Sequence, residues 1–273
     1  MPRLRQKPST PITKLLRRLL KKSDSTWKHI MMKRLKIGSA VATERRPLVA
    51  VPMVDKTIAA IRLTAQALRQ TPADVVEWRI DFLLDLSELT VTNIRQVHEI
   101  LNKPMIFTWR TVDEGGKLTY HHDRYQSVYH DAIQAGVEAV DIEVTLLADQ
   151  QELLKLIPKD VKVIGSKHNF STTPARLDAC LAQMTKLPID IAKLAVMPKD
   201  ATDVERLMQA TASVANESEV PLITMSMGEL GMVSRELGYQ FGSQLTFAVV
   251  NEASAPGQMP LATLLHKWGE SYV

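Results

Sequence analysis

Residues 190–198 read DIAKLAVMP, a short apolar run that ends at a proline and has one lysine near its centre. Ile191, Leu194 and Val196 place bulky apolar side chains on both sides of an extended chain. This pattern is typical of a strand in a parallel sheet that is covered by helices on its faces. Lys193 is the exception, because a lysine is almost never fully buried without a reason. The run therefore predicts a buried strand that contains one chemically distinctive side chain.

Lys193 has two interpretations. Burial disfavours the charged form of an amine, and a neutral amine is a nucleophile that forms a Schiff base with a ketone or aldehyde. In the other interpretation, the lysine lies at the end of the strand and its ammonium group reaches water. For a lysine taken alone the second interpretation is favoured, so other residues have to decide between them.

Similar apolar runs occur from residue 47 onward, and each is followed by a helical pattern. The predicted strands cover residues 47–54, 75–81, 104–110, 139–144, 161–168, 190–196, 221–227 and 244–250. The predicted helices cover residues 57–70, 87–101, 121–136, 148–157, 173–186, 202–216, 229–237 and 260–269. Thr57 is predicted to cap the first of these helices, and Thr173 with Pro174 is predicted to begin the fifth.

Eight strands that alternate with eight helices indicate a parallel α/β fold, the (β/α)8 or TIM barrel. A doubly wound open sheet is the alternative, although no GxGxxG motif follows the first strand to mark a dinucleotide-binding version of it. Residues 33–46 precede the first strand and are predicted to form a short hairpin across the bottom of the barrel. We therefore expect residues 33–273 to form a single catalytic domain.

Residues 1–32 are predicted to be a basic, flexible N-terminal extension. Residues 1–46 carry fourteen Lys and Arg against two acidic residues, a net charge of +12, whereas the remainder carries −8. Within the extension, residues 12–22 (ITKLLRRLLKK) have the pattern of an amphipathic basic helix, which suits a membrane surface or a nucleic acid. The alternative is a dispensable tail. We adopt this alternative, and expect neither a nucleic-acid partner nor a stable membrane association.

The chain has 273 residues and one cysteine, Cys180, so no disulfide can form within it. No apolar run approaches the length of a transmembrane helix. Both features fit a cytoplasmic protein.

Polar side chains recur where the predicted strands end, which in a barrel is the end that carries the active site. The polar residues are Glu77, Arg79, Arg110, Glu114, His168, Lys193, Arg235, Ser254 and Gln258, together with Asp141 and Glu143 inside one strand, and Met225 and Met227 lie at the end of the seventh strand. Each has an ordinary alternative, such as an internal ion pair, a core histidine or a core-filling methionine. Taken together they contain too many charges for a core and instead predict a pocket for a small polar anion.

The residue types indicate the chemistry of this pocket. A lysine and a histidine, without a cluster of metal ligands, suit Schiff-base formation followed by proton transfer at the adjacent carbon. Arginines suit a carboxylate and hydroxyl groups. Lys167 competes with Lys193 as the Schiff-base lysine, but strand alternation should point Lys167 away from His168, towards the helices.

Seven segments together resemble type I 3-dehydroquinate dehydratase. They are EWRID (77–81), FTWRTVDEGG (107–116), DIE (141–143), SKHNFSTTP (166–174), DIAKLAVMP (190–198), TMSMGELGMVSRELG (224–238) and ASAPGQ (253–258). The resemblance covers residues 33–273 and implies a TIM barrel, usually dimeric, that uses no metal or cofactor. It also implies the dehydration of 3-dehydroquinate to 3-dehydroshikimate in the shikimate pathway of aromatic amino acid biosynthesis. Residues 1–32 have no counterpart in the family's ordinary bacterial members.

The resemblance also implies roles for single residues. Lys193 matches the Schiff-base lysine, His168 the group that moves the proton in a syn elimination, and Glu114 the carboxylate that orients this histidine. The residues that match the hydroxyl-binding groups are Glu77, Arg79 and Arg110. The residues that match the carboxylate site are Arg235, Ser254 and Gln258, and Met225 and Met227 match the pocket wall.

Two other functions remain as alternatives. A class I aldolase would also use a Schiff-base lysine in a barrel, but such enzymes often bind phosphate through glycine-rich backbone. A metabolite-sensing regulator would use the pocket for binding alone. Such a regulator would have no use for the combination of Lys193, His168 and Glu114, and a turnover assay separates the two.

Overall fold

The structure, a computed structural model, describes residues 33–270. The predicted amphipathic segment 12–22 and the predicted domain boundary at residue 32 lie outside or at the limit of the described residues. Within residues 33–270 no helix is both long and apolar enough to cross a membrane.

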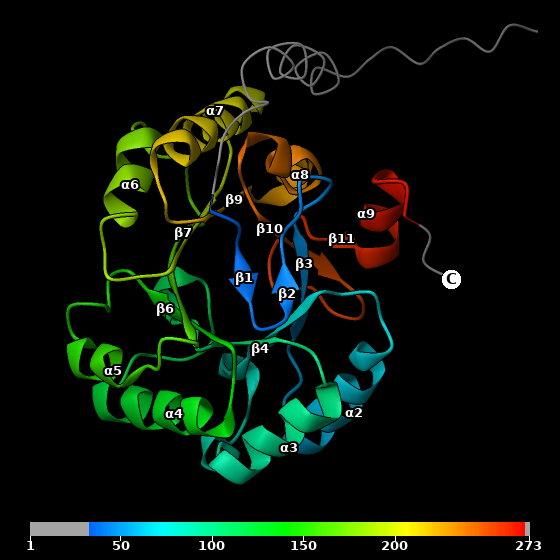
Figure 1. The fold of residues 1–273 in the computed structure, drawn as a ribbon, viewed down its shortest axis with the longest axis vertical. Coiled ribbons are helices and arrows are strands. Elements are labelled where there is room, and N and C mark those ends of the chain that lie inside the picture. Colours follow the sequence, from blue (N-terminus) through cyan, green and yellow to red (C-terminus); the bar gives the residue numbers. More distant parts are fainter. Residues whose placement is uncertain (1–32, 271–273) are drawn as a thin grey trace, which may run out of the picture.

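Eight parallel strands form a barrel, as the alternating pattern predicted, with helices arranged around it (Figure 1). The strands are β3 (Leu48–Met53), β4 (Val75–Arg79), β5 (Met105–Thr108), β6 (Ala139–Glu143), β7 (Lys162–Asn169), β8 (Ile191–Val196), β9 (Leu222–Ser226) and β10 (Leu245–Val249). The helices are α2 (Ile58–Arg69), α3 (Val91–Leu101), α4 (His122–Ala135), α5 (Gln151–Leu156), α6 (Leu177–Met184), α7 (Ala201–Glu217), α8 (Gly228–Leu237) and α9 (Leu261–Lys267). Short 3-10 turns lie at η1 (Ile80–Phe82), η2 (Leu86–Glu88), η3 (Val112–Glu114) and η4 (Gly238–Phe241).

From β3 to β9 each strand pairs in parallel with the next, and β10 returns to pair with β3. The remaining gap, between β9 and β10, is closed by a parallel bridge between Leu222 and Ser243. The Ser243 hydroxyl accepts a hydrogen bond from the Thr224 amide at 2.9 Å and donates one to the Thr224 carbonyl at 3.1 Å. One backbone hydrogen bond, from the Gln244 amide to the Leu222 carbonyl at 2.8 Å, and the Ser243 side chain therefore join β9 to β10 where the barrel closes. A short strand β11 (Met259–Pro260) pairs with the outer edge of β10.

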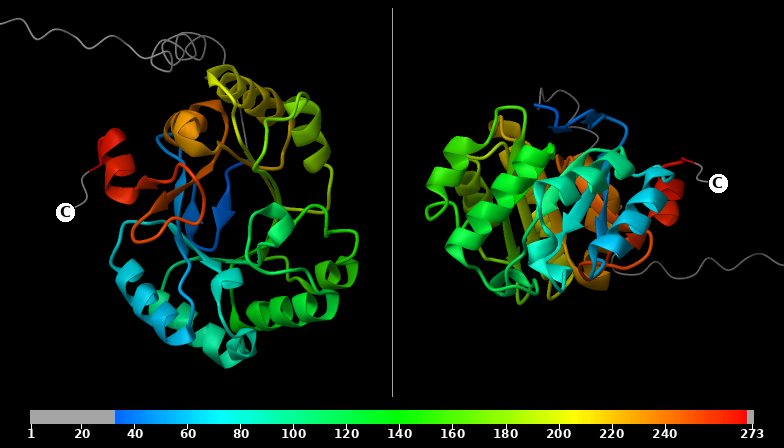
Figure 2. Two further views of the ribbon diagram at one scale, coloured as in Figure 1. Left: turned by 180° about the vertical axis from the view of Figure 1, so that it is seen from behind. Right: turned by 90° about the horizontal axis from the view of Figure 1, so that it is seen from below.

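The predicted hairpin is present as β1 (Lys36–Ile37) and β2 (Ala40–Val41), and it lies at one end of the barrel (Figure 2, right). Leu35 and Ile37 are fully buried against the apolar residues that fill the bottom of the barrel interior. The Gln244 side chain accepts the Leu35 amide at 2.7 Å and donates to the Lys33 carbonyl at 2.9 Å. The hairpin closes this end of the barrel, so the interior opens only towards the carboxyl ends of the strands.

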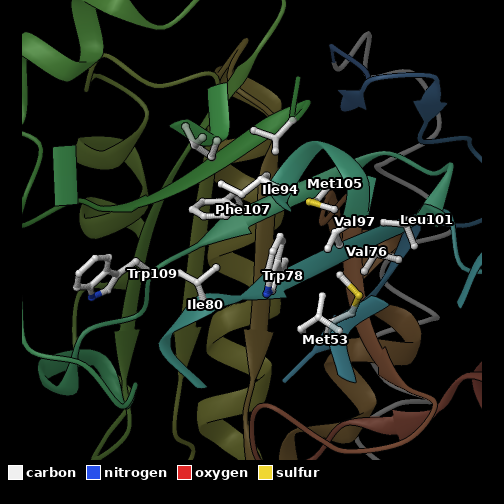
Figure 3. Packing of buried hydrophobic residues seen from close by; sticks show 14 of the residues in the cluster. Met53, Val76, Trp78, Ile80, Ile94, Val97, Leu101, Met105, Phe107 and Trp109 are labelled. Carbon is white, nitrogen blue, oxygen red and sulfur yellow. The ribbon is translucent and has the colours of Figure 1, made fainter. Parts of the chain in front are cut away.

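The barrel has an outer and an inner core, because side chains alternate across each strand. The outer core packs strand residues such as Trp78 and Phe107 against Ile94, Val97 and Leu101 of α3 (Figure 3). The inner core is apolar at the bottom, where Ile106, Ile164, Ile191, Ile223 and Leu245 meet. Above this layer the inward positions on β4, β6, β7 and β8 are polar, whereas Met225 of β9 and Phe247 of β10 keep one side apolar, which places the site there.

Two predicted helix starts are wrong. Thr173 and Pro174 do not begin a helix, because α6 starts at Leu177, and the Thr173 hydroxyl instead donates to the Met197 carbonyl at 3.0 Å. The helix predicted from residue 87 begins only at Val91, with Thr90 as its cap. Thr57 does cap α2, where its hydroxyl accepts the Ala60 amide at 3.2 Å.

Candidate active site

A pocket of about 440 Å³ opens at the carboxyl ends of the strands. It is lined by Glu77, Arg79, Arg110, Glu114, Gly115, His168, Phe170, Lys193, Ala195, Met225, Met227, Arg235, Phe247, Ser254, Ala255 and Gln258. Every residue predicted for catalysis or substrate binding is among them. The barrel therefore brings together side chains that lie up to 181 positions apart in the sequence, the separation of Glu77 and Gln258. The roles of the individual residues remain predictions.

Lys193 lies at the middle of β8, with only 4% of its surface exposed. Its Nζ donates to Asp141 Oδ2 at 2.8 Å and to Glu77 Oε1 at 3.2 Å, and it lies 4.7 Å from the centre of the Phe247 ring. The side chain is buried inside the barrel and its ammonium group is held by two carboxylates, so Lys193 is not a strand-end lysine that reaches bulk water. Burial alone does not describe its environment either, because two carboxylates hold the group in place.

Asp141 is the centre of a buried polar network behind Lys193. Its Oδ1 accepts hydrogen bonds from Arg110 Nη2 at 2.6 Å and from the Ser166 hydroxyl at 2.6 Å. Burial by itself would raise the pKa of Asp141, but Arg110 and Lys193 outweigh burial and hold this pKa well below its usual range. Asp141 is therefore a permanent anion that orients two cations of the pocket.

Arg110 follows β5, and its guanidinium group contacts side chains of β6 and β7. Besides Asp141, it donates to Ser166 Oγ at 2.8 Å and Glu143 Oε1 at 3.2 Å, and its Nη1 lies 3.5 Å from Glu114 Oε2. Burial acts to lower the pKa of Arg110, but the surrounding carboxylates raise it above its ordinary value. The guanidinium therefore stays charged and is fixed in one orientation.

Glu114 and His168 form a second unit at the edge of this network. Glu114 Oε2 lies 2.8 Å from His168 Nδ1 and accepts the His168 backbone amide at 2.9 Å. Burial raises the pKa of Glu114 to about 8, and burial together with Arg110 and Lys193 lowers the pKa of His168 well below its usual value. The imidazole is therefore neutral at physiological pH, as proton abstraction requires.

The ionisation state of Glu114 decides which nitrogen of His168 is free. An ionised carboxylate accepts the Nδ1 proton, which leaves the Nε2 lone pair available as a base. A protonated Glu114 would donate to Nδ1 and place the proton on Nε2. The unit therefore becomes a competent base only when Glu114 loses its proton.

Arg79 and Arg235 differ in how their charges are balanced. Arg79 donates to both oxygens of Asp81, at 2.7 and 2.9 Å, in a buried bidentate pair. Arg235 is 1% exposed and has no carboxylate partner within residues 33–270. It donates only to the Pro256 carbonyl at 3.0 Å and to the Met225 sulfur at 3.4 Å, and its Nε has no partner in the same range. A buried guanidinium without its own anion suits an anionic ligand.

Burial lowers the pKa of Arg235 to about 10, so the group is still charged at neutral pH. Beside it, Ser254 and Gln258 contact each other across the loop that follows β10. The Ser254 amide donates to Gln258 Oε1 at 3.0 Å, and Gln258 Nε2 donates to Ser254 Oγ at 3.1 Å. This sector of the pocket therefore offers a charge and two neutral polar groups to a ligand.

Several residues that shape the site were not singled out from the sequence. Ser166 orients Arg110 and Asp141, and Phe170 and Phe247 line the pocket. Ser166 and Phe170 lie two residues either side of His168, so the strand period was a signal that would have found them. Lys167 is absent from the pocket lining, in agreement with the predicted alternation.

Comparisons with known proteins agree with this geometry. A profile of the family described as Type I 3-dehydroquinase matches residues 49–269. A protein of Listeria welshimeri named 3-dehydroquinate dehydratase is 38% identical over 245 residues, which cover 86% of this chain and 96% of that protein. A protein of the same name from Enterococcus faecalis is 37% identical, with 87% of this chain and 95% of that protein covered.

Solved structures show the same fold. The crystal structure of 3-dehydroquinate dehydratase from Geobacillus kaustophilus matches with a TM-score of 0.81 and 31% identity, and covers 87% of this chain and 95% of that chain. The type I 3-dehydroquinate dehydratase from Clostridium difficile, with covalently modified comenic acid, matches with a TM-score of 0.79 and 31% identity over 88% of this chain and 97% of that chain. The family profile, the relatives and the barrel together show that this chain belongs to the type I 3-dehydroquinase family.

Proposed function

We propose that the protein is a 3-dehydroquinate dehydratase, a hydro-lyase that converts 3-dehydroquinate to 3-dehydroshikimate in the shikimate pathway. One observation carries the proposal. Lys193, His168 and Arg235, a cation with no carboxylate partner within residues 33–270, line the same pocket, so an amine nucleophile, a neutral base and an anion site face one small ligand. The substrate has a ketone, an acidic carbon beside it and a carboxylate, which are the groups these three residues would meet.

The reaction begins at Lys193. The Lys193 ammonium group gives up one proton as its nitrogen attacks the C3 ketone. This proton returns to the carbinolamine oxygen, which leaves as water, so the iminium ion carries the positive charge of the former ammonium group. Glu77 and Asp141, which already accept hydrogen bonds from Nζ, balance this charge. The iminium draws electrons from the C2–H bond and serves as the electron sink, so the proposed chemistry needs neither a metal nor a cofactor.

His168 then moves the proton. Nε2 takes the C2 proton while Glu114 holds Nδ1, and the electron pair of the C2–H bond forms an enamine. The electrons return to form the C1–C2 double bond as the C1 hydroxyl leaves, and the imidazolium supplies the proton that makes it water. This is a syn elimination, since one group serves both steps. Hydrolysis of the imine releases the enone and restores Lys193.

The remaining residues position the substrate. We assign the substrate carboxylate to Arg235, Ser254 and Gln258, and the ring hydroxyls to Glu77, Arg79 and Arg110. Met225 and Met227 form the wall against the ring. A planar guanidinium suits a carboxylate bidentately, whereas the phosphorylated substrates common among aldolases are usually held by glycine-rich backbone. The pocket therefore supports the dehydratase over an aldolase.

We further propose that the enzyme is a cytoplasmic homodimer whose only ligand is its small-molecule substrate. The dimer and the cytoplasmic location rest on the resemblance to the family and on the single cysteine. All the residues assigned to the site come from one chain, so the proposed activity does not depend on the dimer. Sedimentation analysis of the purified protein tests the assembly.

The direct test of the function is turnover of 3-dehydroquinate. The product is a conjugated enone, so its formation raises the ultraviolet absorbance of the solution. We expect this increase with the purified wild-type protein and its loss in Lys193→Ala. A protein that binds 3-dehydroquinate without producing the enone would instead support the metabolite-sensing alternative.

A further inference from the structure

A buried hydroxyl lies between two strands of the barrel, directly behind the site. Tyr129, on α4, is fully buried, and its hydroxyl accepts the Trp109 amide at 3.0 Å and donates to the Asp141 carbonyl at 2.5 Å. In the parallel pairing of β5 and β6, Thr108 is the partner of Asp141. The slanted ladder pattern would then join the Trp109 amide to the Asp141 carbonyl directly. The tyrosine hydroxyl occupies the place of that ladder bond.

The two strands separate beyond this point, and side chains continue the connection. Two residues further along, Glu143 Oε1 accepts a hydrogen bond from the Thr111 amide at 2.8 Å, and Glu143 Oε2 accepts one from the Thr111 hydroxyl at 2.8 Å. The first of these side-chain bridges, from Tyr129, lies directly below Arg110. The spacing of β5 and β6 at the level of the site is therefore set by inserted groups.

The residues on either side of the inserted hydroxyl belong to the site. Trp109 precedes Arg110, and the carbonyl that accepts the tyrosine proton belongs to Asp141 itself. The side chains of these two residues form the 2.6 Å ion pair that orients Lys193, whose Nζ lies 2.8 Å from Asp141. Loss of the hydroxyl would allow the two strands to approach and would move both members of this pair.

We infer that Tyr129 is a positioning residue for the Schiff-base lysine, because its hydroxyl holds β5 and β6 apart at the distance that the Arg110–Asp141 pair requires. The inference rests on the proposed function, in which Lys193 forms the imine. Tyr129 does not touch the pocket and acts only through Asp141 and Arg110. Its ring packs against Tyr125, with ring centres 4.3 Å apart, and edge-on against Phe107, so removal of the hydroxyl alone leaves the apolar contacts in place.

The neighbour Tyr125 provides a matched control. It lies one helical turn away, is equally buried and belongs to the same stacked pair, but within residues 33–270 its hydroxyl makes no hydrogen bond to β5 or β6. Tyr125→Phe therefore removes the same atom from the same layer and leaves both hydrogen bonds from Tyr129 to the strands in place. Differences in kcat and trapping between Tyr129→Phe and Tyr125→Phe therefore measure the effect of the two hydrogen bonds that the Tyr129 hydroxyl makes to β5 and β6.

The experiment measures kcat and KM for 3-dehydroquinate and counts active sites by borohydride trapping. Displacement of a reacting group by about 1 Å can cost on the order of 10²-fold in rate. We expect kcat per trapped site to fall about 10- to 100-fold in Tyr129→Phe, with slower trapping, and to stay within about twofold in Tyr125→Phe. KM should change less than kcat, because the carboxylate site lies near β9 and β10, across the barrel from β5 and β6, and Arg110 is the one residue assigned to the ring hydroxyls that follows β5.

Three results would overturn the inference. Equal kcat per trapped site in the two variants would show that the hydroxyl is not needed for positioning. A lower yield of trapped sites with normal kcat per site, or a Tyr129→Phe chain that does not fold at all, would show a purely structural role. Failure of the proposed function itself is distinguishable, because wild-type protein would then give neither turnover nor trapping.

Discussion

The charge of Arg235 should have opposite effects on stability and on function: it destabilises the empty protein and binds the substrate. The guanidinium is buried without a carboxylate partner within residues 33–270, and this arrangement costs free energy in the empty protein. Replacement of Arg235 by methionine keeps a long apolar chain in the same space and removes the charge. We therefore expect Arg235→Met to stabilise the fold and to weaken substrate binding.

The magnitude follows from the environment of the side chain. Burial lowers the pKa of Arg235 from 12.5 to about 10, which corresponds to a cost of about 3 kcal/mol for the charged form. Against this, the variant loses the hydrogen bond to the Pro256 carbonyl, worth about 1–1.5 kcal/mol. The net gain is about 2 kcal/mol, or a rise of about 4–8 °C in Tm for a domain of this size. The gain should not vary between pH 5 and 9, because the folded-state pKa lies above that range.

The assay compares Arg235→Met with Arg79→Met by thermal and denaturant unfolding. Arg79 is paired bidentately with the buried Asp81, so the same substitution there leaves an unpaired carboxylate and should cost about 3–5 kcal/mol. The two arginines of one pocket should thus give opposite signs. Substrate should raise the Tm of wild type but not that of Arg235→Met, whose KM should rise at least about 10²-fold.

Two results would refute this reasoning. A clear loss of stability in Arg235→Met would show that a group outside residues 33–270 balances the charge of Arg235 in the empty protein. An unchanged KM would show that the substrate carboxylate binds elsewhere.

The remaining predictions concern the base, the carboxylate beside it and the N-terminal extension. His168→Ala should lower kcat by on the order of 10²–10⁴-fold while borohydride still traps substrate, and near-normal turnover would exclude its role as the base. Glu114→Gln should raise Tm relative to wild type at pH 9 but not at pH 4, because the pKa of Glu114 rises from 4.5 to about 8 on folding, so its stabilising contribution is lost as the pH rises through that range. Equal pH dependence of Tm in the two proteins would contradict the raised pKa. A chain that starts at Met32 should fold and turn over substrate within a few-fold of the full chain, whereas aggregation or inactivity would place residues 1–32 in the folded unit.

The fold was predictable because it depends on repeated patterns. Apolar runs at regular spacing gave the order of strands and helices, and two-residue alternation gave the inward side of each strand. This is why Glu77 and Arg79 were expected on one side of β4 while Trp78 packs outward against α3. The hairpin under the barrel followed from the apolar positions of residues 33–46 in the same way.

Local details of single helix starts were not predictable from the same signals. Thr173 followed by Pro174 has the composition of a helix start, but its hydroxyl is used to tie the loop after β7 to the end of β8. A contact with Met197, 24 positions away, therefore overrides the local preference. The turn before α3 shows a similar competition, because residues 86–88 form a 3-10 turn first.

The partners within the site were the least predictable part. The residue types indicated a pocket, but which carboxylate meets which cation depends on the register between neighbouring strands. Asp141 and Lys193 lie on β6 and β8, with β7 between them. The register places Ser166 of β7 beside Lys193, and the Asp141 carboxylate contacts both side chains. The inserted hydroxyl of Tyr129 gave no sequence signal, since a tyrosine on the inner face of a helix is most often apolar core.

The measurement that tests the central claim most directly is reductive trapping. Wild-type protein is incubated with 3-dehydroquinate and borohydride, digested, and analysed by mass spectrometry, with Lys193→Ala treated in parallel. We predict that one reduced ligand is attached to the peptide that contains Lys193, and that the variant carries no label and has no turnover. A label on Lys167, or full turnover without any label, would contradict the assignment of Lys193 as the Schiff-base residue.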